Sequence, residues 1–375
     1  MEIWERLSRL TPEADLDREA GEDEAAKRPM RAGPISWVTA GGKKMPILKA
    51  LLTSACERNC AYCPFRAGRD FRRETFKPHE MAAQIELMTR RGFIRGVLLS
   101  SGIAGGSLAT QDRLLKTAAM LRRDGYTGYI HLKLMPGAEQ EQILEAMRLA
   151  DRVSVNLEAP GEEYLSRLAP QKQFWGELMA TLTKAAKIKE NLPPQRYGRE
   201  RWPSLVTQFV VGAASETDRD LISWSARLLR EAAVKRVYYS AFRPIINTPL
   251  EGKAAERPER VHRLYRAFFL LRDYGFSVDE LFPQNAASLP ADDPKEWWAK
   301  THLAQAPVEV NTAPPEMLMR IPGIGPVRAA AIVQARKETT IRSLTQLRKL
   351  GIPVSKAAPF ILLDGHRPPH QETLW

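Results

Sequence analysis

The sequence predicts an α/β fold, an open and partial TIM-like (β/α)6 barrel, followed by a small all-α domain. Three observations predict this arrangement. Short apolar runs alternate with helical segments from residue 46 onward. The alternation gives six units, fewer than the eight that close a (β/α)8 barrel. Residues 308–363 show only helical patterns.

The six predicted strands are short apolar runs separated by longer polar segments. They are PILKALLT (46–53), GVLLSS (96–101), YIHLKLM (129–135), RVSVNLEA (152–159), SLVTQFVV (204–211) and RVYYSAF (236–242).

The segments between these strands are long and periodic enough to form helices. They are 77–91, 109–124, 139–150, 161–190 and 216–233, and a further helix, 257–273, follows the last strand. Alternation of strands and helices implies βαβ crossovers and therefore a parallel sheet.

The flanking segments set the predicted domain boundaries. Residues 1–45 are charged and weakly periodic, which indicates a short helix or a flexible arm that packs on the next domain. The barrel then covers 46–282. Residues 283–306 are rich in proline, alanine and aspartate and are typical of a connector. A helical domain follows at 307–365, and 366–375 form a loose tail.

Composition and charge exclude several classes of protein. The chain has 375 residues and a formal net charge of +12. The positive excess is spread over 51–306 and 307–375 and suits a polyanionic partner. No apolar run approaches the ~20 residues that span a bilayer, which excludes an integral membrane protein and a membrane partner. The charged N-terminus lacks the apolar stretch of a secretory signal, so we expect a cytoplasmic location.

The three cysteines of the chain, Cys56, Cys60 and Cys63, form a C-x3-C-x2-C motif directly after the first predicted strand. An odd, clustered set favours a metal or cluster site over a disulfide framework. Inert thiols and zinc are the alternatives, but structural zinc usually takes four ligands, and the fourth would have to be a residue such as His79. Three thiolates on one loop suit a [4Fe–4S] cluster whose fourth iron is open to a ligand from outside the protein.

This arrangement resembles the radical S-adenosylmethionine (SAM) enzymes over roughly residues 46–245. In that family the open iron binds the amino and carboxylate groups of SAM. One electron from the cluster cleaves SAM to methionine and a 5′-deoxyadenosyl radical, which abstracts a substrate hydrogen. The resemblance implies that Cys56, Cys60 and Cys63 hold the cluster and that SAM is the second cofactor. It also implies a one-electron reductase or a donor of the flavodoxin or ferredoxin type.

The resemblance also implies contacts with SAM. Tyr62 holds the family's aromatic position, which packs near the adenine. The family's second strand usually ends in Gly-Gly-Glu, which contacts the SAM amino group. In this sequence Ser100, Ser101 and Gly102 stand in for that motif.

Strands four and five complete this set. Alternation along the fourth strand predicts that Ser154, Asn156 and Glu158 face the barrel lumen, with a solvated surface strand as the alternative. In the family, polar residues of this strand contact the ribose. The fifth strand and the residues after it are similar to the family's pattern near the adenine at Val210, Gly212 and Glu216.

Four further residues are candidates for catalysis. The apolar face of the third strand leaves His131 and Lys133 pointing inward. Tyr238 and Tyr239, on the sixth strand, lie near the expected mouth of the site. A structural role for His131 and core packing of both tyrosines are the alternatives.

The C-terminal segment predicts two short helices joined by a tight turn, Pro322–Pro326. The first helix ends near Arg320, and the second begins at Pro326 and is rich in alanine, which allows close packing. A second pair follows, with a capping box at Ser343 and a turn at Gly351. This pattern resembles the helix–hairpin–helix motif of DNA repair and recombination proteins. A helical protein-interaction module is the alternative.

A glycine turn of this kind exposes backbone N–H groups at a helix N-terminus, where an anion is favoured. We therefore expect a DNA phosphate to bind there without readout of the bases. The predicted DNA-binding residues are Gly323, Ile324, Gly325, Arg328, Gly351 and Lys356, with Arg320 as additional charge.

The two halves together resemble the DNA modification and repair radical SAM proteins. The resemblance implies radical chemistry on a nucleotide within DNA, either to repair a lesion or to modify a base or sugar. A target inside a duplex would have to be flipped out or be single-stranded. Two other classes stay open: a radical SAM enzyme that modifies RNA, and a non-enzymatic, DNA-binding iron–sulfur redox sensor.

Overall fold

A computed structural model describes residues 2–11, 34–40 and 43–370, and the chain divides into two compact units. The N-terminal unit extends to Glu216 and includes Arg227–Val261. The C-terminal unit comprises Thr217–Ala226 and the residues from His262 onward. Among the residues described, no helix is both long and apolar enough to cross a membrane.

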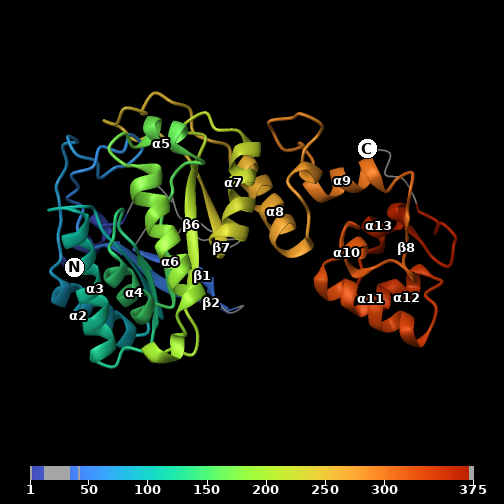
Figure 1. Cartoon of the computed structure of the whole chain (residues 1–375), viewed down its shortest axis with the longest axis horizontal. Coiled ribbons are helices and arrows are strands. Elements are labelled where there is room, and N and C mark those ends of the chain that lie inside the picture. Colours follow the sequence, from blue (N-terminus) through green and yellow to red (C-terminus); the bar gives the residue numbers. More distant parts are fainter. Residues whose placement is uncertain (1, 12–33, 41–42, 371–375) are drawn as a thin grey trace. The chain divides into compact units, whose positions relative to one another are not determined.

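The N-terminal unit is built on one seven-stranded sheet with its strands in sequence order (Figure 1). Strands β2 to β7 are parallel, which confirms the predicted parallel sheet of six strands, and β1 adds an antiparallel strand at the edge. The strands are β1 (Ile35–Ala40), β2 (Lys43–Leu51), β3 (Gly96–Ser100), β4 (Tyr129–Lys133), β5 (Arg152–Ser154), β6 (Ser204–Val211) and β7 (Val234–Ala241).

Helices cover one side of this sheet, as Figure 1 shows for α2 (Pro78–Arg90), α3 (Ser107–Arg123), α4 (Gln140–Leu149) and α6 (Ala180–Asn191). Side chains alternate along each strand, so one set packs on the helices and the other faces the concave side of the curled sheet. Strand β3, GVLLS, is buried at every position, as expected of a central parallel strand. The concave side is the lumen of the open barrel.

The single helix predicted over 161–190 is wrong. The structure has α5 (Glu162–Leu168), then a π-helix (Phe174–Met179) that leads into α6. Pro170 explains the break, because proline lacks the N–H of a helical hydrogen bond and disfavours a helical conformation in the residue before it. A 3₁₀-helix (Pro194–Tyr197), α7 (Asp218–Glu231) and α8 (Pro258–Tyr274) complete the elements that follow the strands.

The fourth predicted strand, 152–159, is also shorter than expected, because β5 ends at Ser154. The hydroxyl of Thr207 donates to the Val155 carbonyl (2.7 Å) and accepts from the Leu157 N–H (3.2 Å), which replaces regular strand pairing. Pairing with β6 resumes at Glu158, whose φ of 66° lies in the left-handed region. The local bulge therefore redirects Glu158 after the strand has ended.

Part of the predicted N-terminal arm is ordered structure. Helix α1 (Glu2–Arg9) is held by Arg6, which bonds the carboxylate of Glu74 (2.9 Å) and lies over the ring of Phe76. The sequence analysis missed strand β1, which falls inside the same arm. Residues 12–33 of the arm and 371–375 of the predicted tail lie outside the described residues.

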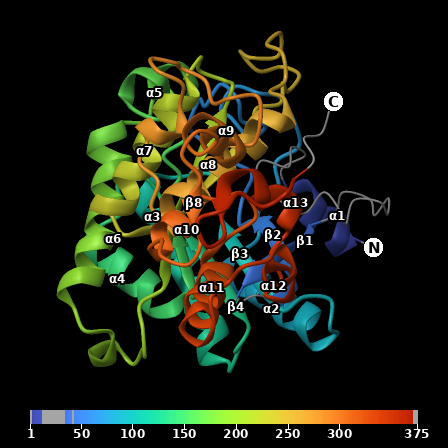
Figure 2. The ribbon, with the colours of Figure 1, turned by 90° about the vertical axis from the view of Figure 1, so that its right-hand side faces the viewer.

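The C-terminal unit contains a group of short helices (Figure 2). They are a 3₁₀-helix (Asp279–Leu281), α9 (Pro294–His302), α10 (Pro315–Leu318), α11 (Pro326–Glu338), α12 (Leu344–Lys349), α13 (Val354–Ala357) and a 3₁₀-helix (Ala358–Phe360). The domain is not purely helical, because β8 (Val308–Glu309) pairs in parallel with β9 (Ile361–Leu362).

The predicted connector, 283–306, is instead part of the C-terminal unit. It contains α9, whose Trp298 is buried and packs edge-on against Phe276 (ring centroids 5.5 Å apart). The buried Lys295 of the same helix donates to the Ile324 carbonyl in the hairpin turn (2.6 Å). Proline and aspartate suggested a linker, but Trp298 buries its large apolar side chain and docks the helix.

Candidate functional site

The loop after β2 brings the three cysteines to one cavity, which we call the cysteine cavity. Cys56, Cys60 and Cys63 all line it, and Cys60 is only 6% exposed. The cavity lies at the carboxyl ends of the strands, the end at which α/β barrels place their active sites. Its other polar lining residues are Arg58, Tyr62, Ser100, Ser101, Lys133, Asn156, Glu158, Lys172 and Gln208.

Two arginines fix the shape of this cysteine loop (residues 52–76). The guanidinium of Arg73 donates to four backbone carbonyls, those of Ser54 (2.7 Å), Phe65 (2.7 Å), Arg66 (2.9 Å) and Arg69 (3.1 Å). Arg58 forms an ion pair with Glu177 on the π-helix (2.8 Å). Because a guanidinium has five N–H donors and no acceptor, it is suited to tie several carbonyls of one loop together.

A buried ion pair lies beside the cysteines. Nζ of Lys172 is 3.0 Å from a carboxylate oxygen of Glu158, and their side chains are 11% and 7% exposed. Burial alone would lower the pKa of Lys172, but Cys60 and Glu158 raise it above its usual value. Lys172 thus stays protonated and provides positive charge next to the thiols.

Two of the thiols, those of Cys60 and Cys63, are costly to ionise in the protein alone. Burial raises the pKa of Cys60, with Lys172 acting in the opposite direction, and burial raises the pKa of Cys63 to about 12. Thiolates therefore form here when a metal centre supplies positive charge and displaces the protons. Three cysteines on one loop, with a buried cation beside them, fit a [4Fe–4S] cluster.

The end of β3 packs directly against the cysteine loop. The Gly102 N–H donates to the Thr53 carbonyl (2.8 Å), and a Cβ added at Gly102 would lie 2.3 Å from the Ala55 carbonyl oxygen. Ser100, Ser101 and Gly102 all line the cysteine cavity. The glycine is therefore required by the close approach of the loop.

The fourth-strand residues lie where alternation placed them, with one exception. Ser154 and Glu158 are buried, Asn156 is half-buried, and all three line cavities on the lumen side. Val155, expected on the opposite face, also lines the cysteine cavity because the strand has ended before it. Burial and then the Glu158 carboxylate raise the pKa of Tyr62, a buried residue of the same cavity.

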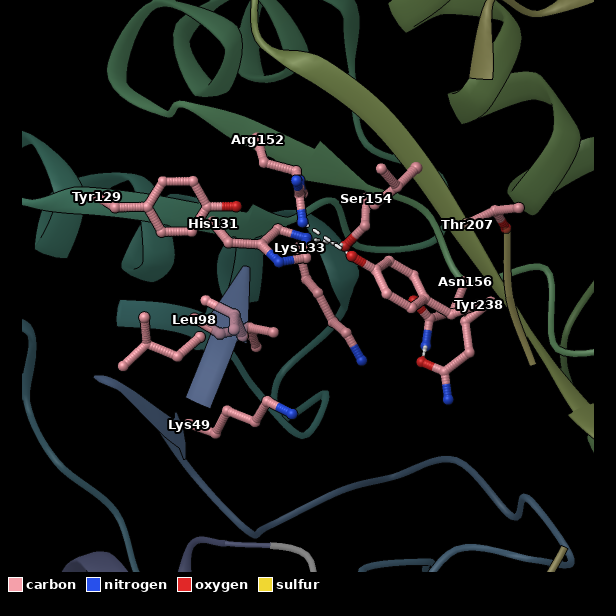
Figure 3. Close-up of a pocket in the computed structure, with 14 residues that line it drawn as sticks. Lys49, Leu98, Tyr129, His131, Lys133, Arg152, Ser154, Asn156, Thr207 and Tyr238 are labelled. Atoms are coloured by element: carbon pink, nitrogen blue, oxygen red, sulfur yellow. Dashed lines mark hydrogen bonds between the residues drawn. The ribbon is translucent and has the colours of Figure 1, made fainter. Parts of the chain in front are cut away.

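A second cavity continues along the lumen; we call it the basic cavity (Figure 3). His131, Lys133, Ser154 and Tyr238, all predicted, line it. Lys133, Asn156 and Gln208 line both cavities, so the two adjoin. Asn156 donates to Gln208 (2.8 Å), which in turn donates to Ser240 (2.8 Å), so a polar row crosses the lumen.

His131 is neutral in this environment. Its Nε2 is 2.9 Å from the Ser154 hydroxyl, and burial, followed by the charges of Arg152, Lys133 and Lys49, holds its pKa well below the usual value. A neutral imidazole can exchange a proton with the Ser154 hydroxyl. Its role in catalysis stays a prediction.

Four predicted residues do not line either cavity. Tyr239 is 1% exposed and packs on Phe209 (ring centroids 6.4 Å apart), because it alternates with Tyr238 and faces the helices. Its placement near the mouth of the site is therefore wrong. Val210 is buried in β6, and its N–H donates to the Glu158 carbonyl (2.8 Å). The N–H of Gly212 donates to the Glu216 carboxylate, so both belong to the turn after β6.

The sequence analysis missed several residues that the structure brings to the lumen. Arg152 and Gln208 lie on the lumen-facing sides of β5 and β6 and line the basic cavity. The alternation that selected Ser154 would also have selected Arg152, two residues earlier, and the same rule applied to β6 would have found Gln208. No local sequence pattern marks Lys172 or Arg73. Lys172 pairs with Glu158, 14 residues earlier, and Arg73 bonds carbonyls between 4 and 19 residues earlier in the cysteine loop.

In the C-terminal unit, the hairpin turn presents backbone donors at the start of α11. Gly323 has a φ of +81°, and Gly325 is the N-cap residue with no side-chain cap. In the described part of the chain, the N–H groups of Gly323 and Gly325 donate to no other group. Those of Val327 and Arg328, in the first turn of the helix, have no partner in an α-helix either. Arg328 is exposed and donates to the Gly323 carbonyl (2.9 Å).

Other predicted DNA contacts are already engaged. The Ile324 side chain is fully buried, and its N–H donates to the Ile321 carbonyl (3.0 Å). The Gly351 N–H donates to the Arg348 carbonyl (3.0 Å). Lys356 forms an ion pair with Glu296 (2.7 Å).

Arg320, expected to add charge, pairs with Glu280 (2.6 Å) and lies over the Phe276 ring. The first hairpin is thus better supplied with donors than the second.

Comparisons with known proteins agree with both parts of the chain. The model of the radical SAM superfamily matches residues 51–223, and the model of a helix–hairpin–helix motif matches residues 304–351. The chain therefore carries a radical SAM domain, whose family uses a [4Fe–4S] cluster and SAM, and a helix–hairpin–helix motif. No curated protein matches the chain at a significant level.

Several solved structures are similar to part of this chain at low sequence identity. HydG, described as a maturase of the [FeFe]-hydrogenase, is 10% identical, covers 60% of this chain and 49% of its own, and has a TM-score of 0.47. HydG from Carboxydothermus hydrogenoformans is 13% identical, with coverages of 60% and 51% and a TM-score of 0.47. Methylornithine synthase is 16% identical, with coverages of 60% and 61% and a TM-score of 0.46. This chain therefore spans about half to three fifths of the length of these three structures.

Proposed function

We propose that this protein is a radical SAM enzyme that acts on a nucleotide in DNA, either to repair a lesion or to modify a base or sugar. The observation that carries the proposal is the presence, in one chain, of a radical SAM domain and a glycine hairpin turn with unpaired backbone donors. The radical SAM domain supplies the chemistry, and the N–H donors of the turn suit a phosphate of the DNA backbone. The positive net charge supports the same assignment.

Different residues of the cysteine cavity bind the cluster and compensate its charge. When bound, the cluster and SAM together supply a 5′-deoxyadenosyl radical that removes a hydrogen atom from the substrate. Cys56, Cys60 and Cys63 hold the cluster, and Lys172 offsets the negative charge of their sulfurs. Cys60 is buried, and Cys56 and Cys63 are half-buried, which limits the access of water to this centre.

The cavity residues predicted to contact SAM are Tyr62 near the adenine, Ser100, Ser101 and Gly102 at the amino group, and Asn156 and Glu158 at the ribose. Glu158 is oriented by Lys172, and Asn156 by Gln208, so both enter the cavity with fixed positions. Ser154 bonds His131 in the basic cavity and is a weaker candidate for a ribose contact. Val210 and Gly212 support the site through the backbone.

The hairpin supplies the proposed DNA contacts. The N–H groups of Gly323, Gly325, Val327 and Arg328 face an anion at the positive end of the α11 dipole. The Arg328 guanidinium adds a charge-assisted contact. These contacts carry no base information, so binding should be weak, salt-sensitive and independent of sequence.

The decisive experiment follows hydrogen from DNA to the cofactor. The anaerobically reconstituted enzyme is given SAM, a reductant and an oligonucleotide deuterated in its sugars and bases, and 5′-deoxyadenosine is analysed by mass spectrometry. We expect deuterium in 5′-deoxyadenosine. Transfer from tRNA but not from DNA would favour the RNA-modifying alternative. DNA binding without any SAM cleavage would favour the redox sensor.

The partners follow from this reaction. A one-electron reductase, or a flavodoxin or ferredoxin, would reduce the cluster, and a cytoplasmic location would supply both it and DNA. The test is SAM cleavage with such a donor in place of a chemical reductant.

A further inference from the structure

The basic cavity contains a group of cations that the proposed radical chemistry leaves unexplained. Lys49, Lys133 and Arg152 line it together with His131, and none of its 14 lining residues in the described chain is an aspartate or glutamate. Figure 3 shows the ammonium ends of Lys49 and Lys133 pointing into the same space. The interior of the barrel therefore concentrates positive charge at one place.

Two hydroxyl groups accept hydrogen bonds from one of these cations, Arg152. Arg152 donates to the hydroxyls of Ser204 (3.1 Å) and Tyr238 (2.8 Å), and its charge lies over the Tyr129 ring at 5.8 Å. In the described chain, the ammonium group of Lys133 makes no hydrogen bond or ion pair. A half-buried lysine usually has a partner for its charge, because removing a charge from water is costly.

The cations also act on one another and on His131. The charges of Arg152, Lys133 and Lys49 all add to the effect of burial on this histidine. Like charges grouped in a space that excludes much of the solvent repel each other. A bound anion would replace this repulsion between cations with attraction. Charged groups that shift one another's pKa values in a cavity are typical of binding sites.

The chemistry of the lining selects the kind of anion. Ammonium and guanidinium groups, together with hydroxyls, favour an oxyanion with several acceptor oxygens. A nucleotide carries such a group as its phosphate. The basic cavity adjoins the cysteine cavity through Lys133, Asn156 and Gln208, so one ligand can reach both.

We propose that the basic cavity binds a phosphate group of the substrate and thereby positions the adjoining part of that substrate in the cysteine cavity. This inference deepens the proposed function and rests on the substrate being a nucleotide. The phosphate has two possible sources, the terminal phosphate of a DNA strand or the phosphate of a free nucleotide.

The first test uses inorganic phosphate and the reconstituted enzyme, with affinity measured by calorimetry at constant ionic strength. We expect Lys49→Met/Lys133→Met to weaken phosphate binding at least tenfold. Lys116→Met, which changes an exposed lysine on α3, should bind phosphate as the wild type does. Equal affinity in the double variant and the wild type, or no binding by the wild type, would overturn the proposal.

A second variant separates charge from folding. Lys133→Arg keeps the cation and should retain phosphate affinity within about threefold. The double methionine variant should be no less stable than the wild type without phosphate, since it removes repulsion. Loss of affinity in Lys133→Arg equal to that in the double variant would contradict a site that depends on charge.

The third arm identifies the source of the phosphate. Wild-type and double-variant enzymes are compared for affinity toward a 5′-phosphorylated oligonucleotide, its 5′-hydroxyl form, thymidine 5′-monophosphate and thymidine. Preference for the phosphorylated member of either pair, lost in the double variant, supports the proposal and names the source. No preference in either pair overturns it. This result is independent of deuterium transfer, so the DNA assignment can fail while the phosphate site stands, or the reverse.

Discussion

The cysteine loop and the hairpin turn are both short loops that carry a sequence motif, but the roles of side chains and backbone are reversed between them. In the cysteine loop, side chains are functional and the backbone carbonyls are structural, since Arg73 ties four of them together. In the hairpin turn, backbone N–H groups are the proposed contacts, and side chains are structural. Ile324 is buried there, and Lys295 bonds the turn's carbonyl.

This difference decides what mutations should do in each region. A change of side chain at a cysteine removes a ligand outright. In the hairpin, the damaging change is the addition of a Cβ, because it alters the path of the backbone. The predictions below test this contrast, beginning with the largest effect.

Cys60→Ala should abolish cluster binding and reductive cleavage of SAM. The chain has three cysteines, all in this loop, so the wild type should hold one cluster, about four iron atoms, after anaerobic reconstitution. Iron analysis and visible absorbance measure this directly. Eight iron atoms per wild-type chain, or full cleavage by the variant, would refute the prediction.

Arg73→Met should destabilise the cysteine loop without removing a ligand. Four backbone carbonyls would lose a charged donor, which we expect to cost about 3 kcal/mol or more. The variant should release iron much faster than the wild type in a chelator challenge. Arg72→Met is the matched control, because Arg72 is exposed. Equal iron release by the two variants would show that the backbone carbonyls need no such support.

Gly323→Ala should weaken DNA binding about tenfold or more while leaving iron content unchanged. Its φ of +81° disfavours alanine, and the new Cβ would lie 2.4 Å from a Pro353 side-chain carbon. Gly365→Ala has a similar φ, +80°, but open space around the new atom, and controls for strain alone. Fluorescence anisotropy with a labelled duplex measures affinity. Unchanged binding by Gly323→Ala would shift the DNA site to the barrel.

Lys295 should make the stability of the C-terminal unit depend on pH. Burial lowers the pKa of Lys295 to about 7, against an effect of Asp293 in the opposite direction, whereas the unfolded chain keeps the usual value near 10.4. The unfolded state therefore binds more protons between these values, and the free energy of unfolding should rise with pH there, by up to about 1.4 kcal/mol per unit.

Denaturant unfolding at pH 6.5, 8 and 9.5 tests the Lys295 prediction, with Lys295→Met as the reference that lacks this titration. Parallel pH curves for the two proteins would contradict it.

Tyr238→Phe should have the smallest effect. No cysteine is available to relay hydrogen if all three bind iron, so a tyrosine, the substrate or 5′-deoxyadenosine must close the reaction. Tyr238 lines the basic cavity and not the cysteine cavity, so we expect turnover within about threefold of the wild type. Tyr239→Phe, in the core, is the control. A large loss of turnover in Tyr238→Phe alone would contradict this expectation and give Tyr238 a part in the reaction, either as hydrogen donor or through its hydrogen bond with Arg152 (2.8 Å).

The elements predicted well were those whose signal is local. The cysteine spacing, the glycine turn and the strand–helix alternation each lie within a few consecutive residues. Alternation also placed Ser154, Asn156 and His131 on the lumen side. Tyr239 was chosen for its chemistry without applying alternation, which places it on the opposite side from Tyr238.

The sequence by itself determined the clustered cysteine motif and the glycine turn, because spacing alone fixes which side chains and N–H groups a short loop can present. The radical SAM assignment came from the resemblance that these motifs carry, and a family model matches residues 51–223. Only the tertiary structure showed that Lys172 pairs with Glu158 beside the cysteines and that Arg152, Lys49 and Lys133 surround one cavity. It also showed that α9 docks in its own unit and that the Ile324 N–H is already bonded. Most of these contacts join residues that are distant in sequence. The Ile324 N–H has more than one possible acceptor nearby, and the local sequence does not show which of them it bonds.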